Sequence, residues 1–363
     1  MKICFLAPAN NAHTIKWCKY FVAQGHHVDV ISFIDSDIPG TTVHFIDTGT
    51  SANGSDKDKL KYLLKSATVR KIIKQLKPDI INAHYATSYG TVAALAGLKN
   101  YILSVWGSDI YEFPQKSFLH KALLKFSLFK AKYLFSTSKA MAEEASKYTN
   151  KTFYITPFGV NIDLFTPKMR DRNDTNFIIG TVKGLAPAYG IDVLLRSAAL
   201  LKNEHPEIPL KIRIAGSGCC EKEYHSLAAK LNIENITTWL GFIPQEQAAK
   251  EWANMDVAVV CSNSESFGVS AVEAQSCGCP VIISDIPGLM EATKPGETSI
   301  VVPKKNEKAV ADALFRLYND ATLRREMGIA GRDYVSKNYE LNDCFNRIEM
   351  LFKTIANNSF SRC

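Results

Sequence analysis

The sequence lacks any long apolar run. No stretch of its 363 residues approaches the roughly 20 apolar residues that a membrane-spanning helix requires. The opening MKICFLAP is a short apolar run without the longer segment and small-residue cleavage site of a secretory leader, so it predicts a first β-strand. These absences favour a cytoplasmic protein. A chain of this length with 46% hydrophobic residues suits two globular domains, each with its own core.

Metal, redox and nicotinamide signatures are also missing. Nine cysteines are scattered, and Cys277-Gly278-Cys279 lacks the two-residue gap of a zinc or redox pair. Gly216-Ser217-Gly218 is followed by Glu221, where a dinucleotide fingerprint needs a third glycine. We therefore expect reduced core thiols, no bound metal and no cofactor.

The excess of positive over negative charge lies in the first half of the chain. Residues 1–165 hold 20 Lys and Arg against 12 Asp and Glu, whereas the remainder holds 23 against 24. No RNA- or DNA-binding signature accompanies this charge, so nucleic acid is not an expected partner. Residues 113–142 contain six lysines and no acid, interleaved with Phe and Leu at three- and four-residue spacing.

Such a segment predicts a basic amphipathic helix, from about 116 to 139, that lies on an anionic membrane surface. A second acid-free basic run, residues 59–77, lies in the same half. The alternative is an ordinary core-facing helix with a solvated basic face. On the membrane interpretation, the protein associates peripherally with the inner face of the membrane.

Short apolar runs alternate with amphipathic segments along the chain, which predicts an α/β fold with parallel sheets and helices on both faces. Strands are expected at residues 3–7, 28–33, 80–83, 102–105 and 133–136, then at 177–182, 211–215, 237–240, 257–261 and 281–284. The series occurs twice, so we expect two doubly wound domains, 1–165 and 166–345, and a terminal helix that includes 346–363. The boundary falls within 159–176, where Pro167 precedes a polar run.

The strongest motif is Glu265-Ser-Phe-Gly268-Val-Ser-Ala-Val-Glu273, which follows a predicted buried strand and continues to Gly278-Cys-Pro-Val-Ile. Gly268 has no Cβ, so the backbone can approach a ligand there. The helix expected over 269–277 aims its N-terminal amides at the same point, which suits a diphosphate. Glu273 can accept hydrogen bonds from a ribose diol with both oxygens. The alternative is a pair of exposed acids at the ends of a helix.

With these residues, the run from 239 to 291 resembles the family-four, group 1 glycosyltransferases, and so do 157–165, 215–218 and 240–244. The resemblance covers essentially the whole chain. It implies the GT-B fold, in which two Rossmann-like domains face a central cleft and a C-terminal helix returns to the first domain. It also implies transfer of a sugar from a nucleotide-diphosphate donor with retention of configuration and without a metal ion.

The resemblance also implies roles for single residues. Glu265 contacts the donor sugar near the leaving phosphate, and Glu273 holds the ribose. The other implied donor-binding residues are Gly268, Val269 and Ser270 at the phosphates, Gly241, Phe242 and Ile243 at the nucleobase, and Gly216 on a neighbouring glycine-rich turn.

The sequence departs from the family pattern in two places. The family usually has two cations five residues apart, whereas this chain has Lys183 and then Ala188. Lys183 is the expected catalytic cation, and a missing phosphate contact typically costs about 10²–10³ in rate. Where many members have His, this chain has Trp106, which offers a stacking face and an indole donor. Asp109 is then the nearest polar candidate for sugar hydroxyls.

His13 and His84 are candidates for acceptor contact together with Trp106, with helix capping or a structural role as the alternative for each histidine. Asp35-Ser36-Asp37 matches a metal-binding triplet of the other glycosyltransferase architecture, but its early position favours a polar loop. We predict a UDP-sugar donor and a glycan or lipid-linked acceptor in bacterial-type surface polysaccharide or lipopolysaccharide assembly. The alternatives are a nucleotide-sugar epimerase, or a sugar-nucleotide-binding protein with little turnover.

Overall fold

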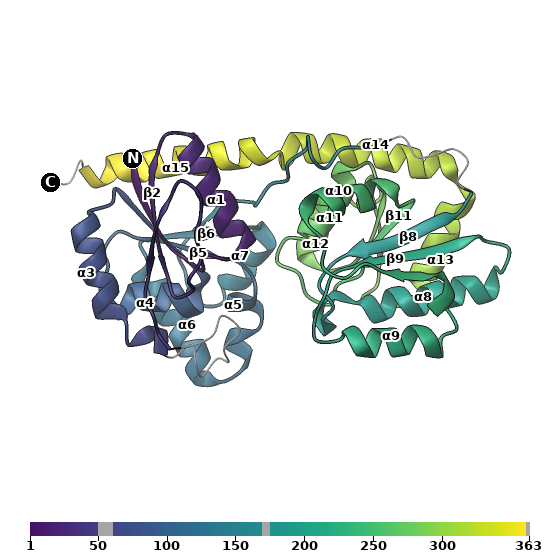
Figure 1. Ribbon diagram of the computed structural model, residues 1–363, viewed down its shortest axis with the longest axis horizontal. Helices are drawn as coiled ribbons and strands as arrows, with labels where there is room; N and C mark the ends of the chain where they lie inside the picture. Colours follow the sequence, from purple (N-terminus) through teal and green to yellow (C-terminus); the bar gives the residue numbers. More distant parts are fainter. Residues whose placement is uncertain (50–60, 169–174, 361–363) are drawn as a thin grey trace. The chain divides into compact units, whose positions relative to one another are not determined.

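The computed structural model describes residues 1–49, 61–168 and 175–360, which form two compact units. The first unit is Met1–Phe158 with the chain from Cys344 onward, and the second is Gly159–Asp343. Each holds one parallel sheet with helices on both faces (Figure 1). The predicted α/β, doubly wound fold is therefore confirmed for both. Residues 169–174 of the expected boundary, and residues 59 and 60 of the second basic run, lie outside the described residues.

The sheet of the first unit has the strand order β3-β2-β1-β4-β5-β6-β7. Its strands are β1 Lys2–Leu6, β2 His27–Ser32, β3 Thr42–Phe45, β4 Ile80–His84, β5 Ile102–Val105, β6 Tyr133–Ser136 and β7 Phe153–Ile155. Its helices are α1 Ala12–Ala23, α3 Ser66–Leu76, α4 Gly90–Leu95, α5 Ser108–Tyr111, α6 Phe118–Lys130, α7 Lys139–Ala145 and most of α15 Leu341–Phe360. The order reverses between β1 and β4, the position where doubly wound sheets bind ligands.

The sheet of the second unit has the order β10-β9-β8-β11-β12-β13. Its strands are β8 Phe177–Val182, β9 Leu210–Ala215, β10 Thr237–Trp239, β11 Val257–Val260, β12 Val281–Ser284 and β13 Ser299–Val302. Its helices are α8 Ile191–Glu204, α9 Glu221–Lys230, α10 Gln245–Asn254, α11 Val269–Ser276, α12 Pro287–Ala292, α13 Glu307–Asn319 and α14 Ala321–Asn338. One core cluster joins the sheet to α8, α9 and α13, and another joins its opposite face to α10, α11 and α12.

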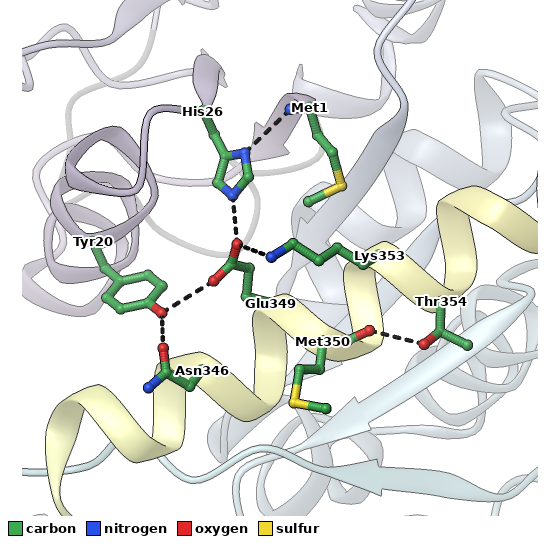
Figure 2. Close-up of polar contacts among 8 residues, drawn as sticks. All are labelled: Met1, Tyr20, His26, Asn346, Glu349, Met350, Lys353 and Thr354. Atoms are coloured by element: carbon green, nitrogen blue, oxygen red, sulfur yellow. Dashed lines mark hydrogen bonds and ion pairs between the residues drawn. The ribbon is translucent and has the colours of Figure 1, made fainter.

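Helix α15 packs onto the first unit, as the sequence predicted. Phe352 stacks on Phe21 of α1 with ring centroids 5.2 Å apart. Glu349 lies beside His26 (Oε1–Nε2, 2.9 Å) and Lys353 (Oε1–Nζ, 2.7 Å), and the Tyr20 hydroxyl donates to it (Figure 2). Although burial opposes it, these partners hold the pKa of Glu349 below its usual value. An apolar contact and a half-buried ionic cluster thus fix the helix on this unit.

The basic segment 113–142 is not one helix. Helix α6 covers Phe118–Lys130 alone, and the buried strand β6 and helix α7 follow it. The prediction of one helix from 116 to 139 is therefore wrong for residues 131–139. The chain leaves the helix at Ala131, where the backbone is extended, because residues 133–136 complete the sheet between β5 and β7.

Candidate active site

In the second unit, the strand order reverses between β8 and β11, and the loops that leave these two strands carry Lys183 and Glu265. The Lys183 ammonium forms an ion pair with Oε2 of Glu265. The Lys183 ammonium also lies 4.7 Å from the centre of the Tyr189 ring. Side-chain exposures of 8% and 13% leave both charges within reach of a ligand. Each residue was predicted separately for the donor site, and the fold brings the two into contact.

Glycine shapes the loop around Glu265. Gly268 has a positive φ of 91° and caps the N-terminus of α11. A Cβ at Gly288 would lie 2.3 Å from the carbonyl oxygen of Glu265, so only glycine lets α12 approach this loop. The Ser270 hydroxyl donates to the carbonyl of Val182 at 3.1 Å, which ties α11 to the end of β8. Ser270 would therefore meet a phosphate through its backbone amide, and the start of α11 suits an anion.

Glu273 lies about one turn into α11 and is half-buried. The indole of Trp252, which is itself fully buried in α10, lies 3.5 Å from Oε2 of Glu273 and orients the carboxylate. Sequence reasoning did not include Trp252 in the site. In the sequence, Trp252 is only an aromatic residue at an apolar position of a helix, which is typical of any protein core.

The loops after β8, β9 and β10 are tied together beside Lys183. A Cβ at Gly216 would lie 1.9 Å from the Lys183 carbonyl, and the Gly216 amide donates to the Gly241 carbonyl at 2.7 Å. Gly216 therefore supports the Lys183 loop by close packing. Phe242 is 82% exposed, so its ring is free to lie against a flat ligand group, and Ile243 packs on the core beneath. We call Lys183, Glu265, Glu273 and the glycine loops around them the ionic site.

Asn263 and Ala188 join the two loops that hold the ionic pair. The Asn263 amide donates to the Ala188 carbonyl at 2.7 Å, and Asn263 Nδ2 donates to the Pro187 carbonyl at 2.8 Å. The Ala188 backbone thus belongs to the frame of the site, while its side chain is a methyl group where a second cation was expected.

In the first unit, His84 ends β4 and is fully buried. Its ring lies among Trp106, Trp17 and Phe5, with centroid distances of 4.2, 5.1 and 5.3 Å. Burial lowers the pKa of His84 to about 3, so the ring is neutral at physiological pH. His84 was expected to contact the acceptor. In the structure, however, its aromatic neighbours cover the ring.

Asp109 also differs from its expected role as a catalytic group. It is 1% exposed, and its carboxylate accepts hydrogen bonds from the amides of Gly107 (2.8 Å), Trp106 (3.2 Å) and Ala86 (2.9 Å). Burial raises the pKa of Asp109, and these amides oppose that rise. Through these hydrogen bonds the carboxylate connects the loops after β4 and β5. It is too deeply buried to contact a sugar.

Tyr85, which sequence reasoning missed, begins a π-helical turn over Tyr85–Tyr89 and has a positive φ of 65°. Such a conformation in a non-glycine residue costs about 1–3 kcal/mol and is often found at functional sites. Its ring meets Trp106 edge-on at 5.0 Å. No sequence signal marks this position, because tyrosine does not favour positive φ.

His13 stacks on Phe158 with centroids 3.8 Å apart and meets Trp106 edge-on at 5.8 Å. Burial, with a smaller effect from Lys16, lowers the pKa of His13 to about 3. Asn11, and not His13, caps α1, since its side chain accepts from the His13 amide at 2.9 Å. Trp106 is only 6% exposed, so the accessible surface belongs mainly to His13 and Tyr85. We call His13, Trp17, His84, Tyr85, Trp106 and Phe158 the aromatic cluster.

Two kinds of feature are absent from residues 1–49, 61–168 and 175–360. Within them, no three His, Cys, Asp or Glu side chains gather in a way that could hold a metal ion. In the same part of the chain, no helix is both long and apolar enough to cross a bilayer.

Comparison with known proteins decides the family. Residues 2–138 match the glycosyl transferase 4-like family, and residues 165–334 match the glycosyl transferases group 1. A D-inositol 3-phosphate glycosyltransferase of Pseudarthrobacter chlorophenolicus is 31% identical over 326 residues, covering 80% of this chain and 76% of its own. The chain belongs to the group 1 glycosyltransferases. The resemblance stated from the motifs is thereby confirmed, and this protein is a glycosyltransferase enzyme.

Solved structures agree on the fold of this glycosyltransferase. Sucrose-phosphate synthase from Thermosynechococcus elongatus has a TM-score of 0.84 at 20% identity and covers 97% of this chain and 98% of its own. Anabaena HepE in complex with UDP-glucose has a TM-score of 0.78 at 18% identity and covers 98% of this chain and 100% of its own. At these identities the likeness establishes the GT-B type of fold.

Proposed function

We propose that this glycosyltransferase uses a UDP-sugar and transfers the sugar with retention to a hydroxyl group of a glycan or lipid-linked acceptor, without a metal ion or cofactor. The observation that best supports this proposal is the Lys183–Glu265 ion pair near the N-terminus of α11, with Glu273 on that helix. Ammonium and helix amides suit a diphosphate, and the oriented carboxylate of Glu273 suits a ribose diol.

In the proposed step, the bond between the sugar C1 and the diphosphate oxygen breaks, and a bond from C1 to the acceptor oxygen forms on the same face. The acceptor proton passes to the departing phosphate oxygen, so no separate base is required. Negative charge grows on the diphosphate, and Lys183 with the α11 amides stabilises it most when the transition state is reached. Glu265 lies beside Lys183 and would contact the reacting sugar.

The test of the donor site is binding of UDP itself. Glu273→Ala should weaken UDP by tenfold or more, since a hydrogen bond to a charged group contributes about 1.5–3 kcal/mol. Isothermal titration calorimetry measures this, and exposed Arg325 on α14 gives the control variant Arg325→Ala. Unchanged UDP affinity in Glu273→Ala would remove Glu273 from the nucleotide site. Retention is checked by the anomeric coupling constant of the product in proton NMR.

A second candidate, nucleotide-sugar binding with little turnover, is favoured by one observation. Ala188 presents a methyl group where the family pattern has a cation. UDP-sugar binding without UDP release, over long incubation with a panel of glycan and lipid-linked acceptors, would support this candidate. Formation of the epimeric UDP-sugar without any acceptor would instead indicate an epimerase.

We also propose that α6 attaches the enzyme to an anionic membrane surface, where lipid-linked acceptors of surface polysaccharide assembly are found. Phe118, Leu119 and Phe129 are 82%, 77% and 69% exposed. Four exposed lysines lie on α6 or just before it, namely Lys116, Lys121, Lys125 and Lys130. Apolar side chains that can insert, flanked by lysines that attract anionic lipid, characterise an interfacial helix.

Each lysine near an anionic surface contributes about 1 kcal/mol. Changing these four lysines to Glu should therefore abolish binding to vesicles that contain phosphatidylglycerol, measured by co-sedimentation. The matched control replaces four exposed lysines of the second unit, namely Lys211, Lys222, Lys230 and Lys250. Equal binding of the unaltered protein to neutral and anionic vesicles, or to neither, would contradict the proposal.

A further inference from the structure

Lys183 is the only cation at the two positions where the family pattern has a pair, because position 188 is an alanine. Its ammonium also faces an acid, since it forms an ion pair with Oε2 of Glu265. A lysine ammonium is a point charge on a flexible four-carbon stem, so its position depends on what surrounds it. The groups that hold this one ammonium therefore matter for the binding of a diphosphate.

The ring of Tyr189 is a second neighbour of this ammonium. The Lys183 nitrogen lies 4.7 Å from the ring centre, within the roughly 6 Å over which an aromatic face attracts a cation. The side chain of Lys183 is only 8% exposed, and such contacts are strongest where water is largely excluded. Unlike the Glu265 carboxylate, a ring face has no full negative charge. It can hold the ammonium without neutralising it.

Two glycines allow the ring to lie there. A Cβ at Gly184 would lie 3.2 Å from Cε2 of Tyr189, so the bare backbone next to Lys183 makes room for the ring. Gly190, directly after Tyr189, has a positive φ of 65°, and a Cβ there would lie 2.0 Å from the carbonyl oxygen of Cys261. Only glycine lets the chain pass so close to the end of β11. These contacts fix the position of the ring beside the lysine.

The turn that contains Tyr189 is joined to the loop that contains Glu265. The Asn263 amide donates to the Ala188 carbonyl at 2.7 Å, and its Nδ2 donates to the Pro187 carbonyl at 2.8 Å. Glu265 follows two residues after Asn263. The ring and the carboxylate therefore approach the ammonium from two loops that are hydrogen-bonded to each other, which keeps the three groups in one arrangement.

We propose that Tyr189 is a positioning residue of this enzyme, because its ring holds the Lys183 ammonium at the point where negative charge develops on the diphosphate. The inference rests on the proposed donor site, since Tyr189 acts through Lys183. Charges that are preorganised before the reaction stabilise a developing charge most. In a site without a second cation at position 188, the placement of Lys183 matters more.

UDP is the probe for this contact, since its terminal phosphate bears the charge that develops as the sugar leaves, and UMP lacks that phosphate. Tyr189→Leu removes the aromatic face and should weaken UDP by about fivefold or more in isothermal titration calorimetry. UMP affinity should change by less than about twofold in the same variant. Tyr189→Phe keeps the face and should bind UDP within about twofold of the unaltered protein.

Tyr318→Leu on α13 is the matched control, because Tyr318 is a half-buried tyrosine of the same unit that packs against Phe177. It should leave UDP affinity unchanged. Full UDP affinity in Tyr189→Leu, equal losses of UDP and UMP affinity, or a loss in Tyr189→Phe as large as that in Tyr189→Leu would each overturn the proposal. Circular dichroism checks that every variant is folded. If Tyr189→Leu does not fold, Tyr189→Met takes its place with the same expected loss.

A double-mutant cycle separates the ring from the donor site itself. Lys183→Ala should weaken UDP by about tenfold, and adding Tyr189→Leu should cause no further loss, because the ring acts through the ammonium. Losses that add up in the double variant contradict the positioning role. If Lys183→Ala leaves UDP affinity unchanged, the proposed donor site fails together with this inference. If Lys183→Ala weakens UDP while Tyr189→Leu does not, only the positioning role fails.

Discussion

The ionic site and the aromatic cluster occupy the same place in their two sheets, beyond the carboxyl ends of the strands where the order reverses. Their chemistry differs. The ionic site keeps partly exposed charges on glycine loops, with Lys183 and Glu265 in contact. The aromatic cluster buries His84 and leaves mainly His13 and Tyr85 accessible, and the neighbouring Asp109 is buried as well. At one switch point an ion pair lies before the start of a helix, whereas at the other Asp109 holds the loops and His84 has no hydrogen-bond partner among the described residues.

This comparison predicts that the largest functional loss comes from the ionic site. Lys183→Ala should lower turnover by about 10²–10³, as loss of one preorganised contact to developing charge does. Release of UDP from the donor measures it under saturating conditions. The control is Lys304→Ala, since Lys304 is exposed at the neighbouring loop. If both variants lose activity equally, the Lys183–Glu265 pair is not specific to the reaction.

The aromatic cluster should determine stability in acid. The pKa of His84 is about 3 in the fold against 6.5 for the free side chain, so protonation favours the unfolded chain. Its contribution is complete above about pH 6.5 and is lost as the pH falls toward 3, at about 1.4 kcal/mol per pH unit. Because the pKa of His13 is also lowered to about 3, His84→Phe should remove about half of the slope from these two residues, which chemical denaturation between pH 7 and pH 4.5 measures. An unaltered slope would mean that His84 is accessible to protons in the fold.

His120→Gln is the matched control for that measurement, because His120 is only half-buried on α6. It should keep the slope of the unaltered protein. UDP affinity at pH 7 should be the same in all three proteins, which separates the stability of the cluster from the function of the ionic site.

The smallest effect is expected at Ala188, which stands where the family pattern has a second cation. Ala188→Lys should raise donor affinity or turnover about tenfold, since a charge-assisted contact contributes about 1.5–3 kcal/mol. Ala188→Met, of similar length without charge, is the control. Steady-state kinetics distinguishes the two variants, and equal behaviour would show that position 188 is turned away from the phosphates.

Much of the fold was predictable because buried parallel strands carry continuous apolar runs. Four of the ten expected strands have the bounds of the structure, namely β5, β6, β8 and β12. The strands missed were β3, β7 and β13, which lie at the sheet edges. Strand β3 has only two apolar residues, Val43 and Phe45, whereas β7 and β13 are short apolar runs that the prediction overlooked. The terminal helix was expected to include 346–363, and α15 begins five residues earlier, at Leu341.

The sequence by itself determined the family, the doubly wound fold and a glycine-capped helix between two glutamates. This motif depends on residues close together in the chain, where a strand, a glycine and a helix start follow one another. Only the tertiary structure brings Lys183 to Glu265, because the two residues are 82 positions apart. Only the tertiary structure decided that His84 is a neutral core residue, that Asp109 holds two loops and that Tyr85 is strained beside Trp106. Burial and hydrogen-bond partners decide these roles, and both come from strands far apart in the sequence.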